Sequence, residues 1–160
     1  MKLMEYEAKE ILRKYGIPAP SGVVIRSPDQ VPECDKVAGD RLVLKAQVEV
    51  GGRGKAGGVL IGGRSEVPAL ARALFSRDIK GVPVREVLVE EWLPITHEYY
   101  LSMTIDRSSK KVLILFAEAG GVEIEELVRT SPEALRRMRI SPLVHELPLF
   151  MVRALVGSAP

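Results

Sequence analysis

The sequence predicts an α+β fold made of two lobes, and three observations support this prediction. Short apolar runs typical of strands alternate with segments of helical periodicity along the 160 residues. Apolar residues make up 46% of the chain and charged residues 28%, as a buried core with a hydrated surface requires. Pro94 interrupts the pattern directly after a strand-like run, so we place the seam between the lobes at this residue.

The composition argues against several functional classes. Lysine and arginine total 23 and aspartate and glutamate 21, so the net charge is only +2 and no strong positive field attracts nucleic acid. A single cysteine, Cys34, excludes an intrachain disulfide and a cysteine-based metal cluster. No signal peptide is visible, and no apolar run approaches the ~20 residues that span a bilayer. We therefore expect a cytoplasmic protein without a membrane partner.

The first part of the chain predicts a helix followed by alternating strands and helices. Apolar side chains recur with helical period from Met4 to Tyr15, and Glu5 and Lys9 form a pair four residues apart on the outer face. Gly16 and the prolines after it end this helix. The next elements are strands at 22–26, 42–46, 59–61 and 86–91, a helix over 27–37 weakened by a proline, and a helix over 65–77 capped by Ser65.

After the seam, the sequence predicts a hairpin and short helices. Strand-like runs over 97–105 and 111–118 flank the polar turn residues 106–109, and Gly120 and Gly121 close this unit. The pair Ser131-Pro132 begins a short helix, and a last apolar stretch covers residues 147–156.

A glycine-rich stretch over residues 51–58 is the most informative local feature. Five of its eight residues are glycines, and Arg53 and Lys55 lie between them. A polyphosphate needs such a surface, because close backbone approach, N–H donors and cations all favour it. Lys45, at the end of an apolar strand, adds a third cation. The alternative is a flexible hairpin with solvated basic residues, since the pattern is neither a Walker loop nor a Rossmann fingerprint.

Two acidic segments are weaker candidates. The run from Glu90 to Leu93 ends a strand in acids and the aromatic Trp92, which suits a base-and-ribose pocket. The alternative there is a strand edge with solvated acids and a core tryptophan. A second group surrounds Gly120-Gly121, and the preference for acids at helix starts explains it without a metal. Its members are Glu118, Glu123, Glu125 and Glu126.

Four blocks of the sequence resemble one known family. Residues 44–48 (LKAQV) and 51–58 (GGRGKAGG) closely resemble the nucleotide-binding start of the β subunit of succinate–CoA ligase. The remaining blocks follow in the order and approximate spacing of that family. They are residues 3–9 (LMEYEAK) with 15–18, residues 87–90 (VLVE), and residues 106–108 with 120–125. The blocks together extend over nearly the whole chain.

The resemblance implies an ATP-grasp fold, in which two lobes close over a nucleotide. By this analogy, residues 20–93 form the first lobe, and residues 1–19 with 94–160 form the N-terminal helix and a partial, truncated second lobe. Lys45 would contact the phosphates beneath a covering loop, and the strand near the seam would meet adenine and ribose. The nucleotide-binding residues implied in this way are Lys45, Gly52, Arg53, Gly54, Glu90, Leu93 and Glu98.

The resemblance also implies an activity and partners. The family forms acyl-CoA from a carboxylic acid, CoA and ATP or GTP, releasing ADP or GDP, through a phosphohistidine on the α subunit. Neither His97 nor His145 is therefore expected to carry phosphate. The Mg²⁺ ligands of the full-length family lie beyond the matched region, so we expect no metal ligands and no catalytic residues here. The expected partners are the α subunit and the nucleotide, and the chain alone is expected to be inactive.

Two alternatives remain open at this point. One alternative is the corresponding half of a malate or citrate acyl-CoA ligase, because these ligases share the nucleotide-binding half and no residue here touches the acid. The other alternative is that the chain is a non-catalytic ATP-grasp-like binding or assembly module. A truncated lobe leaves apolar side chains without cover and favours self-association. The residues concerned are Leu147, Leu149, Phe150 and Leu155.

Overall fold

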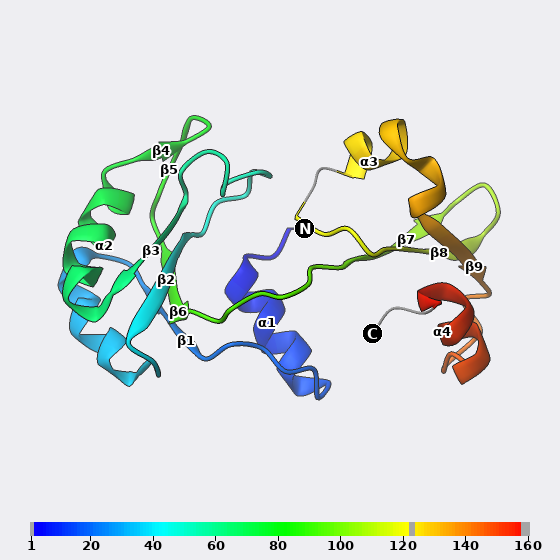
Figure 1. The fold of residues 1–160 in the computed structure, drawn as a ribbon, viewed down its shortest axis with the longest axis horizontal. Coiled ribbons are helices and arrows are strands. Elements are labelled where there is room, and N and C mark those ends of the chain that lie inside the picture. Colours follow the sequence, from blue (N-terminus) through cyan, green and yellow to red (C-terminus); the bar gives the residue numbers. More distant parts are fainter. Residues whose placement is uncertain (1, 122–123, 158–160) are drawn as a thin grey trace. The chain divides into compact units, whose positions relative to one another are not determined.

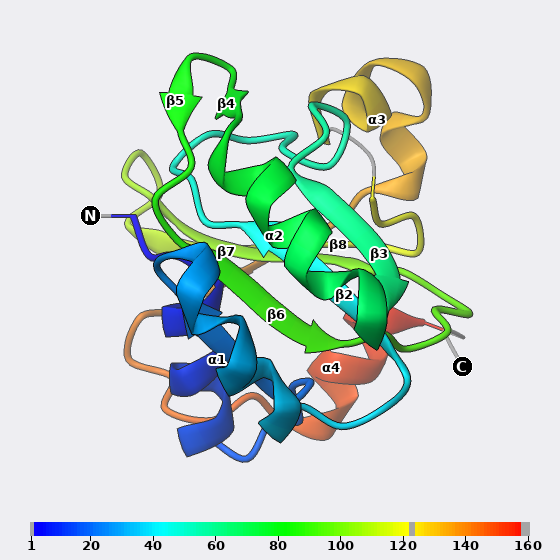
Figure 2. The ribbon, with the colours of Figure 1, turned by 90° about the vertical axis from the view of Figure 1, so that its left-hand side faces the viewer.

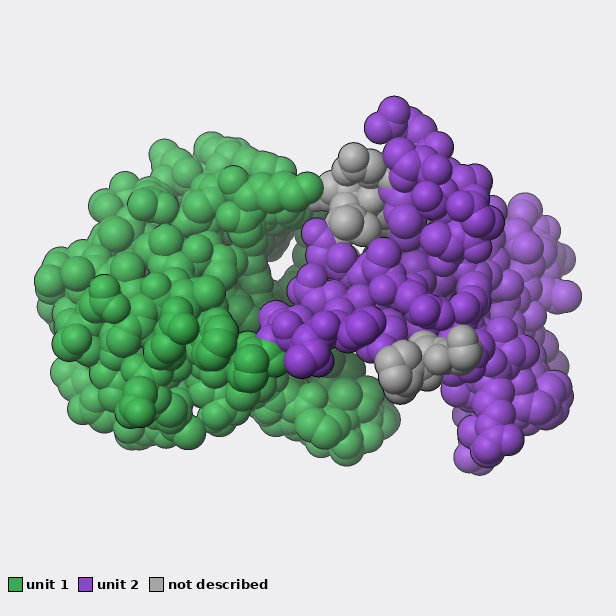
Figure 3. Space-filling model, in the orientation of Figure 1, with its two compact units in different colours: residues 1–94 green, residues 95–160 purple. Residues whose placement is uncertain are grey.

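The computed structural model describes residues 2–121 and 124–157, and the chain divides into two compact units after Pro94 (Figures 1 and 3). The division falls at the proline where the sequence places the seam. The first unit contains residues 1–94, including the N-terminal helix. The resemblance assigns that helix to the second lobe instead, so the correspondence between these units and the two ATP-grasp lobes stays a prediction.

The first unit is built on a four-stranded antiparallel sheet in the order β1-β6-β2-β3. All four strands lie where the apolar runs predict them, because β-branched and leucine side chains fill a sheet that is largely buried. Leu44 sits at the centre, opposite Val89 on one side and Leu60 on the other. The strands are β1 (Gly22–Ile25), β2 (Arg41–Ala46), β3 (Val59–Gly63) and β6 (Val87–Glu91).

The core of this unit lies on one face of the sheet, under helix α2 (Val67–Phe75) and the 3-10 helix Pro28–Lys36 (Figure 2). Alternate strand residues such as Leu42 and Leu44 point into it, and Leu74 of α2 is fully buried against them. Pro32 lies inside the 3-10 helix, in agreement with the weak helix that was predicted. Ser65 does not cap α2: residues Arg64–Glu66 form a separate 3-10 turn before it.

A small hairpin, β4 (Asp78–Ile79) and β5 (Val82–Pro83), follows α2 and was not predicted. Its two-residue turn consists of Lys80 and Gly81, which both have positive φ angles, at 52° and 81°. Such a turn matches the twist of the paired strands. Ile79 is completely buried and fixes the hairpin to the core.

Helix α1 (Glu5–Lys14) meets the opposite face of the sheet with its charged side chains. Glu5 and Lys9 form the predicted ion pair, at 2.7 Å, but both contact groups on the sheet, so the prediction that they lie on an outer face is wrong. Tyr15, on the apolar stripe of the helix, is 81% exposed. Charge pairing therefore decides which face of α1 turns to the sheet.

The second unit contains a three-stranded antiparallel sheet in the order β7-β8-β9. Strands β7 (Tyr100–Asp106) and β8 (Lys111–Ala117) form the predicted hairpin, whereas β9 (Arg136–Ile140) was missed. Ile114 and Phe116 of β8 pack on helix α4 (Leu149–Val156). Ala117 packs instead with Leu127 of helix α3 (Ile124–Thr130) and with Leu135, which follows the 3-10 helix Pro132–Ala134.

The apolar residues near the end of the chain divide into covered and uncovered side chains. Leu149 and Phe150 are 62% and 72% exposed, as the assembly alternative expects. Leu155 is buried against β8 and Leu147 is partly buried, so the expectation that these two lack cover is wrong. One side of helix α4 therefore packs on β8, and the other side leaves its apolar side chains exposed.

Asp106 stabilises the hairpin turn of the second unit, and this contribution should depend on pH. Its carboxylate accepts hydrogen bonds from Ser108 and Ser109 and pairs with Arg139 at 2.9 Å, which lowers the pKa of Asp106 far below its usual range. A carboxyl group with a lowered pKa stabilises the fold at neutral pH and loses this contribution as it is protonated. We expect the protection factors of the amides in β7 and β8, which are exchange rates corrected for the intrinsic rate at each pH, to fall as the pH drops below about 4.

The matched variant for this prediction is Asp106→Asn, which keeps the acceptor oxygen and removes the charge. The hairpin amides of this variant should be less protected from hydrogen exchange at neutral pH, and their protection should change less with pH. Equal pH dependence in the variant and the natural sequence would contradict the role of Asp106.

Candidate functional site

Five charged side chains meet on the face of the first sheet opposite its core. We call Glu5, Lys9, Lys45, Arg53 and Glu90 the ion-pair cluster. Glu90, only 1% exposed, binds both lysines, with Oε1 2.6 Å from Lys9 Nζ and Oε2 2.8 Å from Lys45 Nζ. Glu5 binds the same lysines at 2.7 and 3.0 Å and also contacts Arg53. The structure thus brings together three of the residues that the resemblance implies for nucleotide binding.

The alternation of the strands explains this arrangement. In β2, Leu42 and Leu44 face the core and Lys45 points to the other side. In β6, Val89 faces the core and Glu90 points the same way as Lys45. Because β2 and β6 are paired, with Lys45 opposite Leu88, the ammonium and the carboxylate are near neighbours on one face.

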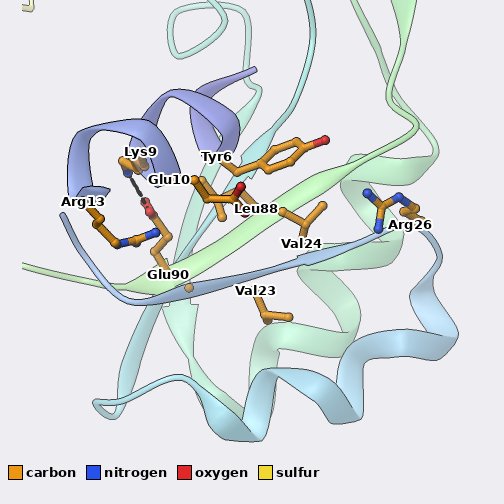
Figure 4. A pocket seen from close by; sticks show the side chains of 10 residues that line it. Tyr6, Lys9, Glu10, Arg13, Val23, Val24, Arg26, Leu88 and Glu90 are labelled. Atoms are coloured by element: carbon orange, nitrogen blue, oxygen red, sulfur yellow. Dashed lines mark hydrogen bonds and ion pairs between the residues drawn. The ribbon is translucent and has the colours of Figure 1, made fainter. Parts of the chain in front are cut away.

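Helix α1 borders a hollow of about 310 Å³ beside Glu90 (Figure 4). In the close view, Lys9 reaches from α1 toward Glu90 on β6, and Arg13 of the same helix also lines the hollow. Burial lowers the pKa of Lys9, while its hydrogen bond to Glu90 acts in the opposite direction. The cluster is therefore a desolvated set of charges whose members depend on one another.

Gly22 of β1 makes room for Glu90. The two residues lie opposite each other in the sheet. A Cβ atom at Gly22 would lie 2.6 Å from Cγ of Glu90 and 2.7 Å from the carbonyl oxygen of Val89. The glycine is therefore required by the close approach of the buried carboxylate.

The glycine-rich stretch forms a series of turns that ends beside the cluster. The carbonyl of Ala46 accepts a hydrogen bond from Arg53 Nη1 at 3.0 Å, and the amide of Gly58 donates to the carbonyl of Arg53 at 2.8 Å. Within residues 2–121 and 124–157, no protein group accepts a hydrogen bond from the amides of 51–55. These amides, with the neighbouring cations, form a donor set that fits a phosphate group.

Leu93 and Trp92 follow the end of β6. Leu93 is 48% exposed. Trp92 lies against the guanidinium of Arg41, whose central carbon is 4.6 Å from the ring centroid, and its amide donates to the carbonyl of Arg41 at 3.0 Å. Trp92 is half-buried at the sheet end rather than inside the core.

Glu98 belongs to the second unit and lines an open hollow there with Thr96, His97 and Glu118. Its carbonyl accepts a hydrogen bond from the amide of Gly120 at 2.9 Å. A Cβ at Gly120 would lie 2.7 Å from Cβ of Glu98, which explains a glycine at this position.

The acidic group around Gly120-Gly121 provides no metal centre in the described part of the chain. There, no three histidine, cysteine, aspartate or glutamate side chains converge in a way that could hold a metal ion. Glu118 pairs with Arg136 at 2.7 Å. Glu123 lies outside the described residues, as do the side chains of Glu125 and Glu126.

Sequence reasoning missed the role of Glu5 and Lys9 in the site. The spacing of an acid and a base four residues apart places both on one helix face, but it does not tell whether that face turns to water or to the sheet. The described helices include none that is both long and apolar enough to cross a membrane.

Comparison with known proteins places this geometry in a family. A family model described as "ATP-grasp domain" matches residues 2–158. The β subunit of ADP-forming succinate–CoA ligase from Ignicoccus hospitalis is 52% identical over 90% of this chain, and the GDP-forming β subunit from Thermus thermophilus is 44% identical over 89%. The chain covers only 39% and 38% of these relatives' lengths.

A solved structure has the same fold. Ca. Korarchaeum cryptofilum ACD1, in complex with coenzyme A, superposes with a TM-score of 0.73 at 20% identity, covering 98% of this chain and 65% of its own. The predicted α+β ATP-grasp fold and the resemblance to succinate–CoA ligase β subunits are confirmed. The chain therefore belongs to the ATP-grasp family and is similar to part of the succinate–CoA ligase β subunit.

Proposed function

We propose that this chain is the nucleotide-binding part of an ADP- or GDP-forming succinate–CoA ligase β subunit. The observation that carries the proposal is the position of Lys45 and Arg53 beside the available amides of 51–55. Together they offer two cations and several N–H donors to a polyphosphate, in a chain similar to β subunits of such ligases. The full reaction forms acyl-CoA from the acid, CoA and nucleoside triphosphate, with an α subunit that carries the phosphohistidine.

Each residue of the proposed site has a distinct task. Lys45 neutralises phosphate charge from the end of a rigid strand, and residues Gly52, Arg53 and Gly54 cover the phosphates with backbone donors. Glu90 holds Lys45 in place, and Leu93 and Glu98 contribute to the base and ribose contacts. When bound, Mg²⁺ supplies further neutralisation of the phosphates. The metal ligands are proposed to belong to the full-length protein, and this chain alone is proposed to lack turnover.

A titration of the only tryptophan tests nucleotide binding. We expect ADP, ATP or GDP, with and without Mg²⁺, to change Trp92 fluorescence saturably, because Trp92 lies two residues from Glu90. Lys45→Ala or Arg53→Ala should weaken binding at least about tenfold, the effect of losing one charge-assisted contact. The matched control is Lys36→Ala, which removes an exposed lysine from the 3-10 helix Pro28–Lys36. This variant should bind nucleotide as tightly as the natural sequence.

Two results would overturn parts of this proposal. A lack of both fluorescence change and calorimetric heat would reject nucleotide binding. Formation of acyl-CoA by the purified chain with succinate, CoA and nucleotide would reject its dependence on a partner. The same assay with malate or citrate and an α subunit separates the related acyl-CoA ligases from the succinate enzyme.

The second candidate function is an assembly module without catalysis. It is favoured by uncovered apolar side chains in the second unit, on the edge strand β7 and on helix α4. Light scattering that gives a monomer at high concentration would count against this alternative. The exposed side chains concerned are Leu101, Met103, Ile105, Leu149 and Phe150.

A further inference from the structure

The carboxylate of Glu5 is surrounded by three cations from three different segments. Lys9 belongs to α1, Lys45 to β2 and Arg53 to the glycine-rich stretch. Lys9 and Lys45 lie 2.7 and 3.0 Å from Oε1, and Arg53 contacts Oε2. Cations that converge in this way on one carboxylate define a place where a negative group is stabilised.

The two carboxylates of the cluster differ in how firmly they are held. Glu90 is 1% exposed and is anchored within β6, whereas the Glu5 side chain is 23% exposed and lies in the first turn of α1. Glu5 does not cap that helix: the amide of Met4 donates to Glu7 Oε2 at 2.7 Å. The Glu5 side chain can therefore leave its partners while the start of α1 stays capped.

We propose that Glu5 occupies an anion subsite formed by Lys9, Lys45 and Arg53, and that a phosphate group of a nucleoside di- or triphosphate displaces it. Three cations and two carboxylates meet in the cluster, so the cations already exceed the carboxylates by one, and departure of Glu5 raises this excess to two. A phosphate offers more oxygens and more charge than a carboxylate and also accepts from the amides of 51–55.

The proposal assigns two roles beyond those already described. Lys9 is a third cationic phosphate ligand, and Glu5 is a competitor whose charge sets the affinity of the site. The identity of the ligand rests on the proposed function, whereas the existence of the anion subsite does not. A probe without a base, inorganic tripolyphosphate, therefore separates the two.

Calorimetric titration of the full chain with tripolyphosphate and with ATP provides the test. Glu5→Gln should bind both about tenfold more tightly than the natural sequence, equivalent to ~1.4 kcal/mol. The matched control is Glu10→Gln, which removes the same charge from an exposed position of the same helix and should change affinity less than about twofold. Adding Lys9→Gln to Glu5→Gln should remove most of the gain.

A second measurement uses the unaltered chain, so that it does not depend on the variants folding. With ¹³C-labelled glutamate, tripolyphosphate should shift the Glu5 carboxylate resonance and leave that of Glu10 in place. A shift of neither, or of both equally, would overturn the proposal.

The outcomes distinguish the two proposals. If ATP binds the natural sequence, Glu5→Gln and Glu10→Gln equally, the subsite is rejected and the proposed function stands. If Glu5→Gln gains affinity for tripolyphosphate but no form binds nucleotide, the subsite stands and nucleotide binding is rejected. If no form binds either probe, both are rejected.

Discussion

Replacing Glu90 by glutamine is expected to lower the free energy of unfolding of the first unit by about 3 kcal/mol. The carboxylate is buried and its two oxygens bind the ammonium groups of Lys9 and Lys45 at 2.6 and 2.8 Å. Glutamine keeps the shape of the side chain but removes one of the two carboxylate charges that compensate the lysines, and it leaves Glu5 alone with three cations. Uncompensated charges in a desolvated site are costly, so the loss exceeds that of an exposed ion pair.

Denaturant unfolding, followed by Trp92 fluorescence, measures this effect. The neighbouring Glu91→Gln is the matched control, since Glu91 is more exposed and has no ion pair in the described structure. It should change the free energy of unfolding by less than about 0.5 kcal/mol. Equal effects of the two substitutions would show that the cluster does not stabilise the fold.

Gly22→Ala should lower the free energy of unfolding by about 2 kcal/mol, because the added methyl group has no space. Its Cβ would lie 2.6 Å from the Glu90 side chain and 2.7 Å from the carbonyl oxygen of Val89. The backbone oxygen cannot move without disturbing the pairing of β1 with β6. The strain should also move Glu90 and so weaken its contact with Lys45.

Gly51→Ala is the control for the removal of a glycine. A Cβ at Gly51 meets no atom within 4 Å, and its φ angle is outside the left-handed region. The free energy of unfolding of this variant should stay within about 0.5 kcal/mol of that of the natural sequence or rise slightly, because alanine has fewer unfolded conformations than glycine. A loss of stability at Gly51 as large as at Gly22 would contradict the steric explanation.

The sheets were largely predictable from the sequence because their strands are continuous apolar runs. The runs at 42–46 and 86–91 became β2 and β6, buried in the centre of the first sheet. Strand β9 was missed because three arginines conceal its alternation. In the structure Met138 and Ile140 are half-buried and Arg137 and Arg139 are exposed, which is the period of a strand.

The candidate site was predictable only in part. The glycine-rich stretch and Lys45 predict a phosphate-binding surface. Nothing local predicts that Glu5, 40 residues from Lys45 in the sequence, contacts this surface. Hydrophobic periodicity favours turning the apolar stripe of α1 inward, and the ion pairs with the sheet prevail instead. Long-range charge pairing of this kind depends on the assembled sheet and has no local pattern.

The burial of Cys34 has a practical consequence for spectroscopy. This sole cysteine is 3% exposed, and burial raises the pKa of its thiol, so thiol reagents should react with it slowly. A cysteine introduced on the surface of residues 95–160 can then be labelled selectively in an otherwise natural chain. With Trp92 as the single native donor, energy transfer to that label would measure whether the distance between the two units changes when ligand is added.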